Sequence, residues 1–313
     1  MEERSPFPEA RREGPAPRAA VEALLAPAME AGRSVIERVV DWEVAAAEAR
    51  RFKVDVSFVL GPAAHRPRFS LNDKGEPVPF RRRLERTLPT LGVPSDSLSA
   101  FFDLSAPGEV QTTASFKWEG ERLDRIGLYY EELSRSARGP ALIAEVFQRA
   151  IGIDPPAPPP GTLPVAVCAD LRDGAFVAAR DYHLATDRPD DPTPLDDSWA
   201  TIEPFRERLP FHEAHGTRRF LMARRAVARG GSSGRKLMWM TECHLPSTAA
   251  KAWATVDELI AELGFDGPET KALADLRRSW PDGDSLYLYP DLVSLNVDGD
   301  GQPEALLVYV SMK

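Results

Sequence analysis

The 313 residues contain no long apolar run, only two cysteines and no excess of positive charge. Because no run of about 18 apolar residues occurs, the sequence predicts no membrane-spanning helix. The two cysteines, Cys168 and Cys243, lack metal-ligand spacing, so we expect no disulfide framework and a reducing, cytoplasmic setting. Lys and Arg total 39 against 48 Asp and Glu, a net charge of −9. This balance argues against a general nucleic-acid binder and against a protein of anionic membrane surfaces.

The rest of the composition predicts one folded domain. With 43% apolar residues, the chain can bury a large core without disulfides. Residues 1–17 are charged and Pro-rich, so we expect a disordered tail there and a single domain over residues 18–313. Many of the 29 prolines gather at 154–164 and 187–194. These segments predict rigid or open connections within the domain.

Pairs of segments with period-2 alternation recur five times and predict five β-hairpins. In FKVDVSFVL, for example, Val54 and Val56 share one face and Asp55 lies on the other. Turn residues such as Asp173-Gly174 join the two members of a pair. The predicted strands cover residues 52–60 with 66–71, 110–118 with 122–133, 164–171 with 175–185, 218–228 with 235–245, and 285–297 with 304–312.

Segments with helical spacing separate these hairpins. They cover residues 19–50, 80–102, 139–152, 196–209 and 247–280. Capping signals support them, as where Pro246-Ser247 precedes a helical pattern that Gly264 ends. The order predicts a structural repeat of roughly two helices followed by two strands, present five times.

Ten consecutive antiparallel strands with one apolar face need helices to cover that face. A closed barrel achieves this and leaves no exposed edges. We therefore expect an α+β fold in which helices ring a barrel and the polar strand faces look inward, with an open α+β sheet as the alternative. A ten-stranded barrel is wider than the eight-stranded kind that side chains fill, so we expect room for a ligand.

The predicted inner face is rich in cations and tyrosines. If the apolar side chains of each strand point outward, the polar residues left inside include Asp55, Arg68, Lys117, Arg125, Tyr129, Arg180, Tyr182, Tyr287 and Tyr309. The fourth hairpin is ambiguous because neither of its faces is clearly apolar.

Unpaired cations are costly to desolvate, so this wall predicts a bound anion. Four or five cations can hold a diphosphate without a P-loop, and no GxxxxGK[ST] motif is present. Each tyrosine ring can stabilise a cation by up to about 2 kcal/mol when desolvated. Together these features suit heterolysis of an allylic diphosphate.

Four segments resemble parts of the ABBA-type aromatic prenyltransferases, whose barrels consist of five helix-helix-strand-strand units. The segments are PRFSLND (67–73), DRIGLYYEEL (124–133), ARDYHL (179–184) and LLVYVSM (306–312). In layout the chain is most similar to the cyanobactin-type peptide prenyltransferases. The family's Lys-x-Tyr pattern appears here as Arg180-Asp181-Tyr182, and WMTECHL stands where a further tyrosine is usual. The similarity therefore lies in architecture more than in residue identity.

The resemblance implies an enzyme that moves a dimethylallyl or geranyl group from its diphosphate to an electron-rich indole, phenol or peptide side chain. It implies that the diphosphate is bound by Arg68, Lys117, Arg125 and Arg180, and that the allylic cation is shielded by Tyr129, Tyr182, Tyr287 and Tyr309. Asp55 stands where related enzymes carry an acid that receives the acceptor's proton. No tightly bound cofactor, membrane or nucleic acid is implied, and Mg²⁺ is an optional assistant.

Other interpretations of the sequence are weaker. His212 and His215 have helical metal-ligand spacing but follow Leu209-Pro210, which indicates a connecting loop. Residues 296–301 resemble the start of a calcium loop, but Leu307 replaces its glutamate, so a hairpin turn is expected. The run DRPDDP (187–192) contains an Asp pair within a Pro-rich loop. A hydrolase would need a GxSxG elbow, which is missing. A non-catalytic barrel that binds a small anion, a lipid-like ligand or a peptide is the alternative function.

Overall fold

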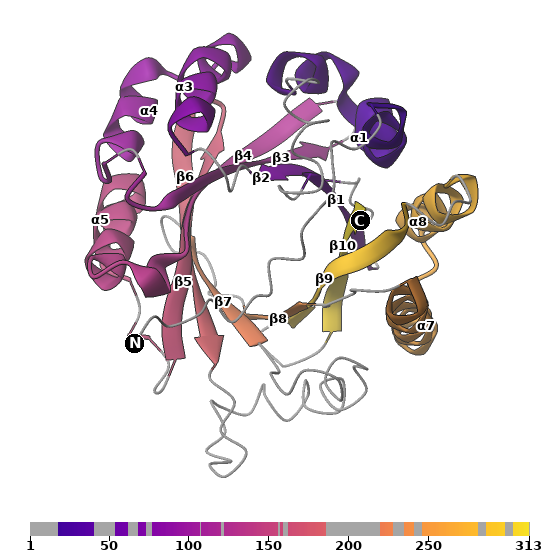
Figure 1. Ribbon diagram of the computed structural model, residues 1–313. Coiled ribbons are helices and arrows are strands. Elements are labelled where there is room, and N and C mark those ends of the chain that lie inside the picture. Colours follow the sequence, from indigo (N-terminus) through magenta and orange to yellow (C-terminus); the bar gives the residue numbers. More distant parts are fainter. Residues whose placement is uncertain are drawn as a thin grey trace, which may run out of the picture.

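The computed structural model describes most of the predicted domain (Figure 1). The described residues are 18–40, 54–61, 68–72, 77–106, 108–119, 122–155, 157–158, 162–185, 220–227, 235–240, 246–280, 286–297 and 303–312. For strands β2 (Arg68–Asn72), β7 (Phe220–Val227) and β8 (Arg235–Met240), the description is limited to the backbone. The predicted tail, the helix at 196–209, His212, His215 and the DRPDDP run lie outside these residues.

Ten antiparallel strands form the centre of the molecule. Besides β2, β7 and β8 they are β1 (Val54–Leu60), β3 (Gln111–Glu119), β4 (Arg122–Glu131), β5 (Thr162–Arg172), β6 (Ala175–Ala185), β9 (Leu288–Val297) and β10 (Pro303–Met312). Each strand pairs with its neighbours in sequence, and β1 also pairs with β10, so the strands close into a barrel (Figure 1). The α+β class and the five hairpins are confirmed, and the open-sheet alternative is wrong.

Helices cover the outside of this ring (Figure 1). They are α1 (Arg18–Val39), α3 (Pro77–Thr87), α4 (Ser95–Phe102), α5 (Gly139–Ile151), α7 (Pro246–Leu263) and α8 (Pro268–Ser279), with short 3-10 turns η1 (Leu88–Leu91) and η2 (Leu133–Arg135). Two α-helices precede the second and the fifth hairpin, as expected. The third hairpin departs from the repeat, because η2 and the single helix α5 precede it. None of the described helices is long and apolar enough to cross a membrane.

The main core lies between the barrel and the helices. Outward residues of the strands, such as Val56, Leu128 and Val310, are buried there together with apolar helix residues. Two polar residues of β6 also lie on this outward side and contact each other. Asp181 and His183 on β6 are both buried, and Nε2 of His183 lies 2.8 Å from Oδ2 of Asp181.

The register of the hairpin between β5 and β6 depends on its turn and on one bulge. Asp173 and Gly174 form its two-residue turn, with φ of 49° and 78°. Both values are positive, as a type I′ turn requires, and Asp-Gly is a favoured pair for that turn. A bulge between Asp170 and Leu171 then shifts the register by one residue. This shift decides which side chains of β5 and β6 face each other inside the barrel.

Tyr130 joins the outer face of β4 to helix α4. Its ring stacks on Phe101 with centroids 4.4 Å apart, and its hydroxyl donates to the carbonyl oxygen of Phe101 at 2.6 Å. Replacement of Tyr130 by Phe removes this buried side-chain hydrogen bond and leaves the carbonyl oxygen of Phe101 with the backbone N–H of Leu104, at 3.2 Å, as a donor. We expect a loss of about 1–2 kcal/mol in the free energy of unfolding, measured by urea denaturation. The exposed Leu163→Ala variant should change it by less than about 0.5 kcal/mol. An unchanged midpoint for Y130F would contradict this packing.

Candidate active site

Strand pairing decides which candidate residues share a face, because partners in an antiparallel register lie on the same side of the sheet. Three rows of partners cross neighbouring strands: Tyr309–Ser57–Arg68–Lys117–Arg125, Asp55–Ser70–Ser115–Gly127–Asp170, and Thr113–Tyr129–Cys168–Arg180–Arg225. The alternate residues belong to the core beneath the helices. The three rows therefore occupy the inner face, as the sequence predicted. Tyr182 shares that face because it lies two residues beyond Arg180.

Arg180 is a buried cation on this inner face, with 3% of its side chain exposed. Its Nη2 forms an ion pair with Oδ1 of Asp170. The same nitrogen donates to Sγ of Cys168 at 3.1 Å and to the hydroxyl of Tyr129 at 3.3 Å. Nη1 donates to the hydroxyl of Tyr182 at 3.1 Å. Nε has no hydrogen-bond partner among the residues that the structure describes, so Arg180 retains a buried donor there.

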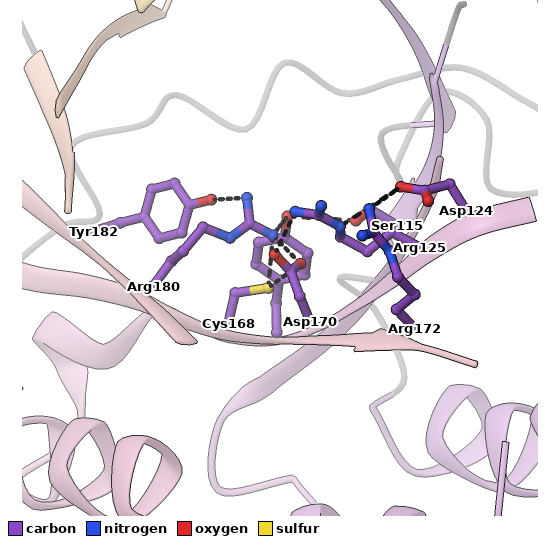
Figure 2. A network of polar contacts seen from close by, with 9 residues as sticks. Ser115, Asp124, Arg125, Cys168, Asp170, Arg172, Arg180 and Tyr182 are labelled. Atoms are coloured by element: carbon purple, nitrogen blue, oxygen red, sulfur yellow. Dashed lines mark hydrogen bonds and ion pairs between the residues drawn. The ribbon is translucent and has the colours of Figure 1, made fainter. Parts of the chain in front are cut away.

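Arg125 shares the same carboxylate. Its Nη1 lies 3.4 Å from Oδ2 of Asp170, while its Nε lies 3.8 Å from Oδ2 of Asp124 and has no hydrogen-bond partner. Arg172 is the last member of the network, and its Nη2 lies 2.8 Å from the same Asp124 oxygen. Figure 2 shows these side chains on the side of the strands that faces away from the helices. Among the described contacts, the network alternates three guanidiniums with two carboxylates, an excess of one positive charge.

The contacts of Asp170 contradict the expectation that the inner cations are unpaired. The inner cations were expected to need an external anion because they had no counter-ion, yet Asp170 contacts both Arg180 and Arg125. Asp170 itself is buried, with 1% of its side chain exposed. The need for an anion therefore rests on the positive excess and on the unsatisfied Nε donors.

Three of the four predicted shielding tyrosines come together. Tyr129 and Tyr182 have ring centroids 6.1 Å apart, and Tyr309 packs against the small cluster that contains Tyr182 and Cys168. Leu292 of β9 joins the same cluster. Because β10 and β9 are not neighbours of β6 in the barrel, these side chains meet across its interior. Tyr129, Tyr182 and Tyr309 therefore lie together, and their role as a shield stays a prediction.

Tyr287 does not belong to this group. It precedes β9, and it packs with Tyr289 against Ala249 and Ala252 of helix α7. The two tyrosine rings have centroids 6.2 Å apart. Tyr287 lies apart from the other three because it precedes the strand and a bulge near Pro290 interrupts the alternation, and its role as a shield stays a prediction.

The remaining candidates lie farther along the rows. Asp55 is buried on β1 opposite Ser70. Lys117 is half-buried, and its register partners are Arg68 on one side and Arg125 on the other. Arg68 is placed by its backbone alone. These three positions share the inner face with Arg180, and their side-chain roles stay predictions.

Gly127 leaves the space that the Arg180 network needs. It faces Asp170 across β4 and β5 and Ser115 across β3 and β4. A Cβ atom at this position would lie 2.6 Å from Oγ of Ser115 and 2.9 Å from the ring of Tyr129. It would also lie 3.3 Å from Oδ1 of Asp170. The missing side chain thus allows the ring of Tyr129 and the carboxylate of Asp170 to approach.

Burial keeps the phenols of Tyr129 and Tyr182 and the thiol of Cys168 protonated. It raises the pKa of Tyr182 to about 12 and that of the Cys168 thiol to about 12, while the positive charge of Arg180 opposes both shifts. Burial also raises the pKa of Tyr129 well above its usual value. For Arg180, burial lowers the pKa but the Asp170 carboxylate raises it, and it ends above its usual value. At neutral pH the cluster presents a guanidinium, neutral phenols and a neutral thiol.

Sequence reasoning missed Asp170, Cys168, Arg225 and Lys236. Asp170 and Cys168 alternate on β5 and could have been found from their period-2 spacing. Arg225 is the register partner of Arg180, and Lys236 shares a face with Asn296 and Ala223 through its register partners. The fourth hairpin has no clear apolar face in the sequence. Only the pairing of β7 and β8 with their neighbours shows which of its residues lie on the inner face.

No metal centre is evident in the part of the chain that the structure describes, since no three His, Cys, Asp or Glu side chains there are grouped to hold an ion. The calcium-like segment connects β9 and β10, whose register partners Val297 and Pro303 flank it as a hairpin. The hairpin expected there is confirmed.

Solved structures with this fold are aromatic prenyltransferases. A 6-dimethylallyl tryptophan synthase matches at TM-score 0.65 and 18% identity over 95% of this chain and 96% of that one. The 6-dimethylallyltryptophan synthase from Micromonospora olivasterospora, in complex with DMASPP and Trp, matches at TM-score 0.65 and 16% identity over 95% and 98%. The ternary complex of PriB with L-tryptophan and dimethylallyl thiolodiphosphate matches at 0.62 and 16% over 94% of each chain.

These likenesses cover almost the whole chain and establish a shared fold. No family model matches the sequence, and no curated relative matches it. Structural similarity is thus consistent with the expected α+β fold, where sequence comparison finds nothing. The second and third of these structures contain tryptophan.

The raised pKa values predict late ionisation of the buried tyrosines. A raised pKa means that folding favours the neutral phenol, so this contribution to stability is present below about pH 10 and is lost as the pH rises through about 12. Alkaline titration of tyrosinate absorbance should show that only some of the six tyrosines ionise near pH 10. The Tyr182→Phe variant should lose one late step. Ionisation of all six near pH 10, with the circular dichroism of the fold unchanged, would contradict the burial.

Proposed function

We propose that this protein is a prenyltransferase that moves a short isoprenoid, dimethylallyl or geranyl, from its diphosphate to an electron-rich acceptor. The observation that carries the proposal is the pair of guanidiniums, Arg180 and Arg125, on the inner face beside the tyrosine cluster. Both carry an Nε donor without a hydrogen-bond partner. Anionic oxygens are the ligands that match such donors, and guanidinium groups bind phosphate oxygens in a planar, bidentate manner.

The donor diphosphate is held by cationic positions that the barrel brings to one face. Arg125 and Arg180 are the two of these cations that contact Asp170, and Arg68 and Lys117 extend the same face along β2 and β3. Arg225 and Lys236 add two further cationic positions by register. In this interpretation the ten strands form an ABBA-type barrel of five units, and its interior holds the donor and the acceptor. A tightly bound metal is not required, and Mg²⁺ is at most a companion of the donor.

The reaction begins when the bond between the allylic carbon and the diphosphate oxygen breaks. The bonding electrons leave with the diphosphate, and the guanidiniums stabilise its growing negative charge. Tyr129, Tyr182 and Tyr309 present π faces to the allylic cation and exclude water from it. Tyr129 and Tyr182 stay neutral because burial raises the pKa values of their phenols. A tyrosinate would instead capture the cation.

The acceptor completes the reaction. An electron-rich carbon or heteroatom of the acceptor donates its electron pair to the allylic carbon and forms the new bond. The acceptor then loses a proton, which Asp55 accepts as a general base. The solved structures with this fold include complexes with tryptophan and an analogue of dimethylallyl diphosphate, which supports an indole acceptor. Phenols and peptide side chains are the other acceptors of this class.

Substitution of the shared guanidiniums tests donor binding. Arg180→Gln and Arg125→Gln should each lower kcat/KM for dimethylallyl diphosphate by about 100-fold, because each removes charge-assisted hydrogen bonds to the leaving group. The assay incubates the full chain with dimethylallyl and geranyl diphosphates and with tryptophan, a phenol and a peptide. Mass spectrometry then detects the isoprenyl increment on the acceptor.

Arg122→Gln is the matched control. Arg122 lies on the same strand as Arg125, but it is exposed and pairs with Asp173. This variant should retain normal turnover. Near-normal turnover in both R180Q and R125Q would overturn the assignment of the donor site, and absence of any isoprenyl product would favour the non-catalytic barrel.

The role of Asp55 predicts a separate kinetic effect. Asp55→Asn should lower kcat by about 100-fold or more and leave the KM for the donor nearly unchanged, because proton transfer follows donor binding. The rate against pH should also lose its acidic limb, which reports protonation of the base. A normal kcat with a raised donor KM would show that Asp55 serves the donor site instead.

A further inference from the structure

One carboxylate holds together the two best-defined cations of the inner face. Asp170 contacts Arg180 through Oδ1 and Arg125 through Oδ2. The two guanidiniums belong to different strands, β6 and β4, and β5 carries Asp170 between them. Two like charges at such short range repel each other, and the shared carboxylate offsets that repulsion. Asp170 is thus placed where an anionic ligand of both arginines would place its own oxygens.

Burial makes this counter-ion essential to the ligand-free protein. Arg180 and Asp170 are 3% and 1% exposed, so water cannot replace either partner. Removal of one member of a buried ion pair leaves an uncompensated charge and is strongly destabilising. The raised pKa of Arg180 has its favourable cause in the same carboxylate, against the opposing effect of burial.

We propose that Asp170 is an internal counter-ion that substitutes for the donor diphosphate in the free protein and limits how tightly diphosphate is held. This inference rests on the proposed function. Asp170 acts through Arg180 and Arg125, so it is a positioning residue. Its charge keeps the two guanidiniums in place before the donor arrives, and the same charge repels the diphosphate once it is bound.

This arrangement has a consequence for turnover. The reaction leaves inorganic diphosphate on the same arginines, and it must dissociate before the next donor binds. A site with fully uncompensated cations would hold that product tightly and would turn over slowly. With Asp170 present, part of the positive charge is already neutralised, so the product leaves more readily.

The test compares the wild-type chain with Asp170→Asn, which keeps the shape of the side chain and removes its charge. Isothermal titration with inorganic diphosphate should show about tenfold tighter binding to D170N, equivalent to about 1.4 kcal/mol. Without ligand, D170N should have a lower Tm than wild type. Saturating diphosphate should raise the Tm of D170N by more than that of wild type, because the ligand supplies the missing counter-charge. In turnover, D170N should show a lower donor KM together with a lower kcat.

Two matched variants serve as controls. Asp170→Glu keeps the charge and should retain diphosphate affinity near that of wild type. Asp173→Asn removes an exposed carboxylate that pairs with Arg122 outside this network, so its affinity for diphosphate should change by less than about threefold, which corresponds to less than about 0.7 kcal/mol. Unchanged or weaker diphosphate binding in folded D170N would overturn the proposal, since a purely structural carboxylate predicts that result.

The outcomes separate this inference from the proposed function. If wild type does not bind diphosphate at all, the donor site itself is wrong and the inference falls with it. If wild type binds it, R180Q abolishes binding and D170N does not tighten it, the inference alone is wrong. If D170N unfolds when purified, diphosphate in the purification buffer should restore a folded protein. Failure of saturating diphosphate to do so would also contradict the proposal.

Discussion

The pairing of β1 with both β2 and β10 is the constraint on which the rest of the structure depends. It turns a row of five hairpins into a ring, so the residues of one strand face converge on a common interior. In an open sheet, Tyr309 of β10 and Tyr182 of β6 would lie at distant positions along the row. In the ring they belong to one cluster with Cys168. Closure therefore creates the site, and the helices outside supply the buried apolar area that holds it closed.

Charge compensation is the second physical constraint on the inner face. The chain is acidic overall, yet it gathers cationic positions inside the barrel and places a carboxylate between two of them. Buried arginines without a counter-ion would be costly, and a fully neutralised set could not bind a diphosphate. In the network around Asp170, one carboxylate contacts two guanidiniums, so their positive charge is only partly neutralised. The neutral phenols beside it complete a surface suited to both an anionic leaving group and a short-lived cation.

Much of the barrel could be predicted from the sequence because strand faces repeat every two residues. That period placed Asp55, Arg125 and Tyr309 on the inner face before any coordinates were considered. The same rule does not extend to Tyr287, which precedes its strand, and it gave no answer for the fourth hairpin. The predicted repeat of two helices before each hairpin also differs from the structure at the third hairpin, which follows η2 and the single helix α5.

The sequence by itself determined the hairpins, the covering helices and the polar character of one strand face, because turn residues and side-chain alternation are local properties. Only the tertiary structure decided that Asp170 contacts Arg180 and Arg125. Continued from the Asp173-Gly174 turn, the hairpin register would pair Cys168 with Ala179. The bulge after Asp170 shifts that register by one residue and places Cys168 opposite Arg180. Such a bulge, and the contacts made across the ring, depend on packing between distant segments, which no local pattern encodes.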